Sequence, residues 1–584
     1  MKTFGFTALI NSVLYKLEGE DIDYSQCMKS EKTACYGHFI DKFADDKIFR
    51  ESGDYVLLFD GVVLNKRQLM NAAKETDWFS YLIVRYEEKG DVFFDELRGS
   101  FGGLLVDKRK NKAILFTDHI GSKFMYYTLN GDSFACSTMI ANLYNIRHNN
   151  GLKCTLSEQG AIMLLTYGFM LENYTLCEEV KKVQPGCYVT FEDGCVAEHR
   201  YCLLDNTPDY SITERDAIEL YDKEFRRTVA LEFDKDREYG YRHLVALSAG
   251  LDCRMTSWVA HEMGYTDQLN VTFSQTDYWD ETVPKQMAAE MKHEWMFKAL
   301  DNGLWLYNLD NVLEITGGNV LYYGQAHGFS MNKYLNFEEF GIAHSGQLGG
   351  GVMGSHVPEN GVPFEYGMGA YSTKYLNYLD IAHLSQYENK ELGMYYCRLF
   401  NGTMNGQVTT YPFLESTAPF MDWDLMNKIK KVREPYFTVD YKRDQNGKIL
   451  LKKHPLISFD YRINSHGNAY RTSKISGNAS VLSFDQVEFV LVSKNPDDGM
   501  IFYDTQEILP IVPIEPIAPL DGYNKKSFII PYSSGRSEYS FFFKVGGRYG
   551  KGVISYDEWR NHNIENLYIN NEKDPEKKRN LWTE

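Results

Sequence analysis

The segment that most constrains the fold is residues 244–254, LVALSAGLDCR, an apolar run that enters a turn of small residues carrying one carboxylate, Asp252. Apolar residues then recur at helical spacing from Met255 to Met263, and Gly264 follows where helices commonly end. A strand, a turn without side-chain bulk and a helix start leave backbone N–H groups directed at an anion. Asp252 can also bind a magnesium ion that bridges phosphate oxygens. The segment therefore predicts a phosphate site.

Two common phosphate-binding motifs are excluded by the residues present. No Gly-Lys-Ser/Thr follows the turn, as a P-loop requires, and the turn itself is not a G-x-G-x-x-G. An ordinary strand-to-helix turn with a surface aspartate remains the alternative, because the motif is short.

Composition limits the class of protein. A chain of 584 residues is too long for one core and predicts several domains. The formal net charge of −18 argues against non-specific binding to nucleic acid or to an anionic membrane, so small-molecule or protein partners are expected. The ten cysteines show no C-x-x-C or metal-ligand spacing and are expected mostly as buried thiols. No run of about 18 apolar residues occurs, and a cytoplasmic location is the expectation.

The first two hundred residues predict sheets packed against helices. Residues 55–69 are interpreted as a strand, a turn at Asp60-Gly61 and a second strand. Two more hairpins are predicted over 101–116 and 187–201, and helices over 78–87 and Glu158–Tyr167.

From about residue 206 the pattern alternates strands with helices, which predicts a parallel sheet covered on both faces. Its expected strands are 244–247, 268–273 and Phe340–His344. Ligands of such sheets bind at the carboxyl ends of the strands. The residues that fall there are Ser248, Phe273, Ser345 and Gly346.

These ordered motifs resemble the asparagine synthetase family, whose members split ATP between the α and β phosphates. Residues 248–254 are similar to its pyrophosphate loop Ser-Gly-Gly-Leu-Asp-Ser, with departures at Ala249 and Cys253. Residues 60–65 are similar to its Asn-Gly-Glu-Ile-Tyr-Asn, and residues 97–127 follow its Leu-x-Gly-x-Phe … Arg-Asp-x-x-Gly-x-Lys-Pro-Leu-Tyr-Tyr.

The resemblance implies an α+β fold for the first part, an N-terminal-nucleophile (Ntn) hydrolase-like αββα sandwich, followed by an α/β parallel-sheet domain, Rossmann-like with a PP-loop. We expect a degenerate glutaminase-like domain over 1–205, an ATP-binding synthetase-like domain over 206–480 and a divergent region over 481–584. Prolines recur every third residue within 509–520, the polyproline II period, and favour a stiff connector over a segment that docks on an aromatic groove.

The glutaminase chemistry of the family is predicted to be absent. Its nucleophile is a cysteine exposed by removal of Met1, but residue 2 here is Lys2. Val62 stands where the family has Glu, and Trp78 follows Asp77 where the family again has Glu. We therefore predict no glutamine hydrolysis, with residues 1–205 kept as a scaffold.

The resemblance implies ATP and Mg²⁺ as cofactors. Residues 345–351, SGQLGGG, align with the family's Ser-Gly-Glu-Gly-x-Asp-Glu, so Gln347 and Gly350 replace two carboxylates. Asp252 and Gln347 are the implied catalytic residues, and Asp252 is the implied metal ligand. The implied nucleotide-binding residues are Leu247, Ser248, Ala249, Gly250, Asp252, Cys253, Phe273, Ser345 and Gly346. Asp280-Glu281 matches either a family helix or an acidic helix start, and both readings stay open.

The leading hypothesis is an ATP-dependent ligase that activates a small-molecule or peptide carboxylate as an acyl-adenylate and passes it to ammonia or an amine. A catalytically inactive relative that binds a nucleotide or a partner is the competing hypothesis, because two carboxylates are missing. An ammonia-dependent asparagine synthetase is a weaker third. A homodimer stays open, and so does the role of four lysines in neutralising pyrophosphate, namely Lys448, Lys452, Lys453 and Lys474.

Overall fold

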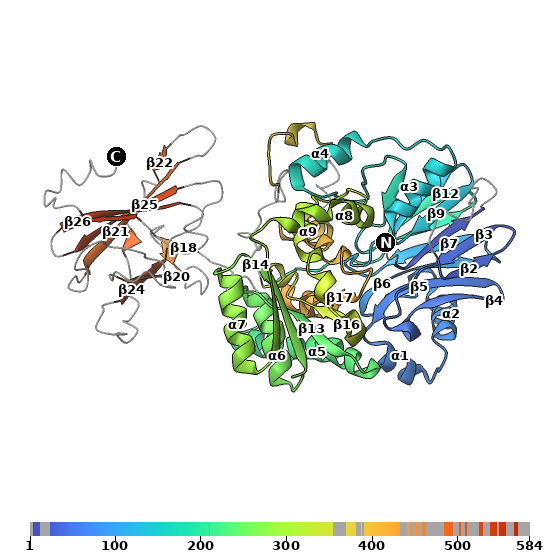
Figure 1. Cartoon of the computed structure of the whole chain (residues 1–584), viewed down its shortest axis with the longest axis horizontal. Coiled ribbons are helices and arrows are strands. Elements are labelled where there is room, and N and C mark those ends of the chain that lie inside the picture. The colour runs from blue at the N-terminus through green and yellow to red at the C-terminus, as the bar shows by residue number, and fades with distance from the viewer. Residues whose placement is uncertain are drawn as a thin grey trace. The chain divides into compact units, whose positions relative to one another are not determined.

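The computed structural model divides the chain into two compact units, Met1–Phe437 and Thr438–Glu584, shown in Figure 1. In the first unit it describes residues 4–11, 24–209, 211–353, 370–380, 387 and 390–432, and in the second unit the strands alone. The domain boundary predicted at residues 480–481 lies outside the described residues, as do the four lysines and most of the proline-rich segment. The domain limits stay predictions.

The first half of unit 1 consists of two six-stranded antiparallel sheets, with strand orders β10-β8-β9-β1-β3-β2 and β12-β11-β7-β6-β5-β4. The strands of the first sheet are β1 Phe6–Ile10, β2 Gln26–Lys29, β3 Thr33–Gly37, β8 Tyr126–Asn130, β9 Ser133–Ser137 and β10 Val180–Lys182. Those of the second are β4 Ile48–Ser52, β5 Tyr55–Val63, β6 Gly99–Asp107, β7 Lys112–Thr117, β11 Cys187–Glu192 and β12 Cys195–Arg200.

Successive side chains of a strand point to opposite faces of its sheet, and the central strands β1, β9, β5, β6 and β7 are buried at nearly every position, so both faces of each sheet are covered there. One buried cluster takes Phe6 and Ala8 from the first sheet and Leu58 from the second, and so fills the space between them. The outer faces carry helices, with α1 Lys66–Ala73 and α2 Trp78–Lys89 over the second sheet and α3 Ile140–Asn149 and α4 Glu158–Tyr167 over the first. This confirms the predicted αββα layers.

The hairpin predicted over residues 55–69 is wrong. Strand β5 runs unbroken from Tyr55 to Val63, and Asp60 and Gly61 pair with Gly102 and Phe101 of β6. Gly61 has φ 121°, and a Cβ there would lie 2.1 Å from the Ser100 carbonyl oxygen. Glycine is thus required because two backbones approach closely within a sheet, not because the chain turns.

The other local predictions are confirmed. Strands β6 and β7 form one hairpin, and β11 and β12 form another. The helix predicted over 78–87 begins at Trp78, where the Asp77 side chain accepts a hydrogen bond from the Ser80 N–H, and α4 has the predicted bounds.

The second half of unit 1 contains a five-stranded sheet with order β15-β14-β13-β16-β17, in which every pair is parallel. Its strands are β13 Arg242–Ala246, β14 Gln268–Ser274, β15 Glu294–Ala299, β16 Phe340–His344 and β17 Glu415–Thr417. The connecting helices include α5 Glu214–Tyr239, α6 Leu251–Glu262 and α7 Trp279–Met291 (Figure 1). The predicted parallel sheet is confirmed.

Shorter helices complete unit 1. They are α8 Leu309–Thr316, α9 Tyr323–Phe329, α10 Gly349–Val352, α11 Lys390–Met394, the π-helix Tyr395–Thr403, α12 Asn405–Val408 and α13 Trp423–Lys430. Single 3₁₀ turns lie at Ala44–Asp46, Gly90–Val92, Leu304–Asn308, Asn332–Tyr334, Phe337–Glu339, Leu376–Tyr378 and Pro419–Met421.

In unit 2 the described residues form strands. They are β18 Tyr441–Arg443, β19 Ile449–Leu451, β20 Ser458–Arg462, β21 Phe484–Lys494, β22 Ile501–Tyr503, β23 Leu509–Pro510, β24 Lys525–Ile529, β25 Glu538–Val545, β26 Arg548–Ser555 and β27 Asn566–Ile569.

A buried charge cluster ties the antiparallel half of unit 1 to the parallel sheet. Glu415 of β17 contacts the ammonium groups of Lys47 at 3.0 Å and Lys123 at 2.8 Å, and Lys123 also lies 3.1 Å from Asp60. All four side chains are 5% exposed or less. Burial lowers the pKa of Lys123, but the carboxylates of Asp60 and Glu415 outweigh it and raise this pKa overall. Each charge in the cluster therefore depends on its partners.

We predict that Lys123→Met strongly lowers the free energy of unfolding of the chain, by about 3–5 kcal/mol, because it leaves Asp60 buried without its cation. The matched control is Lys108→Met, which removes an ion pair to Glu51 whose side chains are 39% and 38% exposed. That change is expected to cost under about 1 kcal/mol. Urea unfolding of both variants measures the difference, and equal losses would contradict the role given to the cluster.

Candidate functional site

The site is built where three adjacent strands of the parallel sheet end. Strands β14, β13 and β16 are neighbours and end at Ser274, Ala246 and His344. The structure therefore brings the loops that begin at Ser248 and Ser345 to one edge of the sheet, as the sequence predicted. The Thr256 hydroxyl of α6 joins them, because it donates to the Ser345 carbonyl oxygen at 3.1 Å.

The loop after β13 presents backbone amides at the start of α6. Gly250 is the N-cap residue, and its N–H donates to the Ser248 hydroxyl at 3.1 Å. The N–H of Ala249 donates to a carboxylate oxygen of Asp280, in the first turn of α7, at 2.7 Å. An amide of this loop therefore already binds an anionic oxygen. The sequence allowed two interpretations of Asp280 and did not predict this contact.

Asp252 lies in the first turn of α6 and faces the glycine-rich segment after β16. Its carboxylate accepts a hydrogen bond from the Gly350 N–H at 2.8 Å, and burial raises its pKa. A Cβ on Gly349 would lie 2.4 Å from the Asp252 carboxyl carbon, and one on Gly346 would lie 2.4 Å from the Cys253 nitrogen. The glycines at 346 and 349 are thus needed for this close approach.

Gln347 points toward the short helix α12. Its side-chain amide donates to the Thr403 carbonyl oxygen at 3.1 Å, and a Cβ on Gly406 would lie 2.5 Å from the same nitrogen. Its carbonyl oxygen is buried and has no hydrogen-bond partner within the described structure. A buried acceptor left unpaired is costly, so this oxygen is suited to a ligand that donates a hydrogen bond.

The remaining predicted nucleotide-binding residues lie around the same edge. The carbonyl oxygen of Leu247 accepts from the Thr272 hydroxyl at 2.7 Å, which joins the loop to β14. Phe273 packs edge-to-face on His327 with ring centroids 5.0 Å apart, and burial raises the pKa of the Cys253 thiol. The half-buried Phe273 ring offers an aromatic surface beside the loop.

A charged histidine cluster that the sequence did not reveal lies beneath these loops. The two ring nitrogens of His344 contact Asp236 at 2.7 Å and Glu232 at 3.2 Å, and His243 contacts Asp236 at 3.0 Å. Burial lowers the pKa of His344, but the two carboxylates outweigh it and raise the pKa to about 9. Asp236, His243 and His344 lie close enough to share a metal ion. A protonated His344 with both nitrogens occupied is instead an ion-pair partner.

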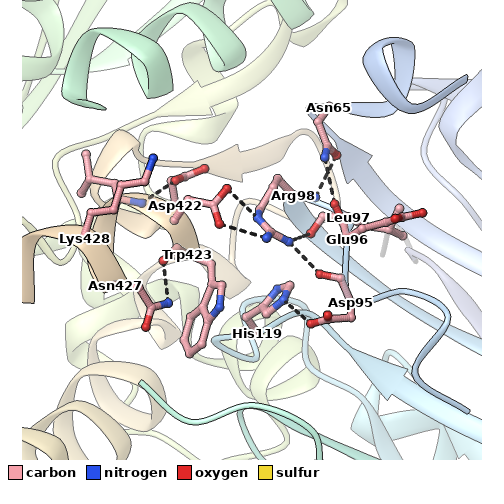
Figure 2. A network of polar contacts seen from close by, with 12 residues as sticks. Asn65, Asp95, Glu96, Leu97, Arg98, His119, Asp422, Trp423, Asn427 and Lys428 are labelled. Carbon is pink, nitrogen blue, oxygen red and sulfur yellow. Dashed lines mark hydrogen bonds and ion pairs between the residues drawn. The ribbon is translucent and has the colours of Figure 1, made fainter. Parts of the chain in front are cut away.

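Figure 2 shows the polar contacts that close the interface between the two halves of unit 1 near α13. Arg98 forms a bidentate pair with Asp424, with distances of 3.0 and 2.9 Å. His119 contacts Asp95 at 3.3 Å and stacks on Trp423 with ring centroids 5.1 Å apart. An enclosed cavity of about 20 Å³ beside them has room for one water molecule.

A larger cavity of about 390 Å³ lies elsewhere on the interface between the two halves. Its lining comes from residues 24–25 and 38–42 of the antiparallel half and from residues 337–338 and 412–413 of the other. His38 lines it, is 4% exposed, and has its Nδ1 atom without a hydrogen-bond partner among the residues that the structure describes. Burial lowers the pKa of His38 to about 4, so this ring is neutral.

Comparison with known proteins finds similarity over part of the chain. Residues 35–202 match the family described as glutamine amidotransferase domain. The chain is 30% identical over 103 residues to glutamine-hydrolyzing asparagine synthetase 2 of Bacillus subtilis, a region that is 17% of this chain and 14% of that protein. It is 22% identical over 284 residues to putative glutamine-hydrolyzing asparagine synthetase 2 of Methanocaldococcus jannaschii, 46% of this chain and 53% of that protein.

Two solved structures are also similar. A B. subtilis glutamine phosphoribosylpyrophosphate amidotransferase complexed with ADP and GMP matches at a TM-score of 0.23 and 10% identity, over 51% of this chain and 60% of that one. A structure titled as the allosteric regulatory enzyme of purine biosynthesis matches at 0.24 and 10%, over 51% and 75%. In the described part of the chain, the helices are too short or too polar to cross a membrane.

We predict that the His344 cluster makes the stability of the chain depend on pH. The folded pKa lies above the ordinary value of 6.5, so the stabilisation is complete below pH 6.5 and is lost as the pH rises toward 9. His344→Gln should remove this dependence, which amounts to roughly 3 kcal/mol. Urea unfolding between pH 6 and pH 9 measures it, with the exposed His148→Gln as the control. Parallel pH profiles for wild type and His344→Gln would contradict the assignment.

Proposed function

We propose that this asparagine synthetase-like chain, which carries a glutamine amidotransferase domain, is an ATP-dependent ligase that forms an amide without hydrolysing glutamine. In the proposed reaction a substrate carboxylate attacks the α-phosphate of ATP, which gives an acyl-adenylate and pyrophosphate. Ammonia or an amine then attacks the acyl carbon and displaces AMP. Activation is needed because the oxygen of a carboxylate is a poor leaving group.

The observation that carries the proposal is the arrangement of Asp252 and the Ala249 amide at one edge of the parallel sheet. The Ala249 N–H already binds an anionic oxygen, that of Asp280, at 2.7 Å, and the start of α6 favours negative charge. Ser248, Ala249 and Gly250 would hold the phosphates of ATP. The aromatic surface of Phe273 beside the loop suits a nucleobase.

The residues present suit a magnesium ion that is held by one protein carboxylate together with phosphate oxygens and waters. Asp252 is the carboxylate that faces the loop after β16, and magnesium commonly uses one or two protein carboxylates together with phosphate oxygens and waters. When bound, the ion would neutralise charge on the departing pyrophosphate. The Asp252 carboxylate would have to leave the Gly350 N–H or share an oxygen between that N–H and the ion.

Gln347 supports a nitrogen nucleophile. Its buried carbonyl oxygen has no partner among the described residues and is suited to accept a hydrogen bond from an N–H group. The side-chain nitrogen is held by Thr403, so the carbonyl oxygen has a defined orientation. In this role Gln347 would orient the attacking ammonia or amine next to the acyl group.

The antiparallel half supports the absence of glutamine hydrolysis. Val62 is fully buried in a cluster with Phe43 and Ile342, so it offers no polar group to a substrate. Trp78 is 5% exposed, and its indole N–H donates to the Asp46 carbonyl oxygen at 3.0 Å. The positions where the family carries glutamates are therefore packed by apolar and aromatic side chains.

We also propose that the protein acts in the cytoplasm.

A catalytically inactive relative is the second candidate, and the Gly350 contact favours it. The N–H of Gly350 satisfies the Asp252 carboxylate at a position where the family has a second acidic residue. An ammonia-dependent asparagine synthetase is a third candidate, and aspartate with ammonium as sole substrates tests it.

We predict that the purified chain catalyses exchange between pyrophosphate and ATP in the presence of Mg²⁺ and one carboxylate from a panel of amino acids and peptide acids. Asp252→Asn should lower the exchange rate about 10²-fold, because it removes the carboxylate that faces the loop. The control, Asp132→Asn, changes an exposed carboxylate in the antiparallel half and should leave the rate unchanged. Exchange that is absent with every carboxylate, while calorimetry still detects ATP binding, would instead indicate the inactive relative.

We also predict that the chain releases no ammonia from glutamine and that Lys2→Cys does not create this activity. The variant supplies the missing thiol, but Val62 and Trp78 remain packed in the interior. Ammonia release is measured by a coupled assay with glutamine as substrate, and ammonium chloride serves as the positive control for the assay. Glutamine hydrolysis by the wild type or by Lys2→Cys would refute this part of the proposal.

A further inference from the structure

Residues 152–180 belong to the antiparallel half and also pack against the second half of unit 1. They contain α4 and contact that half through several backbone and side-chain atoms. The Leu176 N–H donates to the Asn319 side chain at 2.8 Å, and the Gln159 amide donates to the Tyr378 carbonyl oxygen at 3.1 Å. Phe169 also forms an isolated backbone bridge with Val320. This segment is part of the contact between the two halves.

Two cysteines meet at the base of this segment. The sulfur atoms of Cys154 and Cys177 lie 3.0 Å apart, and an antiparallel bridge between Leu156 and Cys177 holds the two chain stretches side by side. A disulfide bond has a length of about 2.05 Å, so an approach of about 1 Å would join them. The pair does not take part in the proposed ligase reaction.

The surroundings of the pair differ in a way that suits a two-step oxidation. Cys154 is exposed, whereas Cys177 is buried and its S–H donates to a carboxylate oxygen of Glu179 at 3.2 Å. Thr155 holds that carboxylate by its N–H at 2.9 Å and its hydroxyl at 2.7 Å. Burial raises the pKa of Cys177 to about 12, so this thiol has to lose its proton before it can react. Burial raises the pKa of Glu179, but the hydrogen bonds from Thr155 outweigh it and lower this pKa to about 2, so the carboxylate positions the Cys177 thiol by accepting its hydrogen bond.

We propose that Cys154 and Cys177 form a reversible disulfide. The bond would close residues 154–177, which include α4, into a covalent loop. With a low-molecular-weight disulfide as oxidant, the Cys154 thiolate attacks one sulfur, and the first thiolate of the oxidant leaves. The released thiolate takes the proton of Cys177, which attacks the Cys154 sulfur, and the second thiolate of the oxidant leaves and takes up the proton that Cys154 had given to water. Two S–H bonds and one S–S bond are broken, one S–S bond is formed in the protein, and the oxidant is reduced to two thiols.

The chain itself offers a direct test. Residues 154–180 contain no lysine or arginine and are bounded by Lys153 and Lys181, so trypsin releases both cysteines in one peptide. The full-length protein is incubated with oxidised glutathione, alkylated with iodoacetamide and digested. We expect this peptide to be lighter than its reduced form by two hydrogen atoms and to carry no alkyl group. Cleavage after Glu158 and Glu172 should then release residues 159–172, while the fragment with Cys154 and the fragment with Cys177 stay joined until reduction.

Single substitutions distinguish a disulfide from simple shielding of the thiols. In Cys177→Ser, the remaining Cys154 should keep glutathione as a stable mixed disulfide, and in Cys154→Ser the oxidant should leave Cys177 as a thiol. Cys195→Ser, at an exposed cysteine of another strand, should behave as wild type. Oxidised wild type should also unfold at a higher temperature than reduced wild type, and Cys154→Ser should show no such shift. Glutathione that stays bound to Cys154 in the wild type, or two alkylated cysteines after oxidation, would overturn the proposal.

Discussion

The contact between Glu415 and the ammonium groups of Lys47 and Lys123 holds the two halves of unit 1 in one arrangement. Both lysines come from the antiparallel half, whereas Glu415 lies on β17 at the edge of the parallel sheet. Because ions in a dry interior are costly unless paired with good geometry, separation of the halves is opposed by the loss of both cations from Glu415 and of the carboxylate from Lys47, whereas Lys123 would keep Asp60. The position of the candidate site, on the neighbouring strands β16 and β13, is therefore coupled to the antiparallel half although no proposed site residue comes from it.

A second polar cluster holds strands β16 and β13 against helix α5. His344 and His243 lie on β16 and β13, and both contact Asp236 of α5. The loops that follow these strands begin within five residues of the two histidines, at Ser345 and Ser248. A shift of β16 would break the ion pair of His344 with Asp236, and a shift of β13 would break the contact of His243 with the same carboxylate. The cluster thus serves as rigid support for the two loops, which a site for phosphates requires.

Local signals allowed much of the fold to be predicted, but contacts between distant residues were not. Helix α4 was predicted with correct bounds because its signals are local, with Ser157 capping its start and Gly168 following its end. The Asp60-Gly61 pair was misread as a turn because its residues match a turn motif, whereas the ion pair to Lys123 and the approach of Ser100 place them inside a strand. The convergence of the loops at Ser248 and Ser345 was predicted from the strand pattern. The contacts of Asp280, Gln347 and His344 were not, because each joins segments far apart in sequence.

The hydrogen bond from the Ala249 N–H to Asp280 means that a carboxylate of the chain itself already occupies an anion-binding amide of the proposed phosphate loop. Any incoming anion has to displace that carboxylate, at the start of α7, before it can reach the amide. Binding of a nucleotide is then an exchange of one anion for another, and its apparent affinity is reduced by the strength of the internal contact. Small anions such as inorganic phosphate, with few other contacts to offer, would be poor competitors. A nucleotide that also stacks its base gains further binding free energy, which offsets the loss of the contact between Ala249 and Asp280.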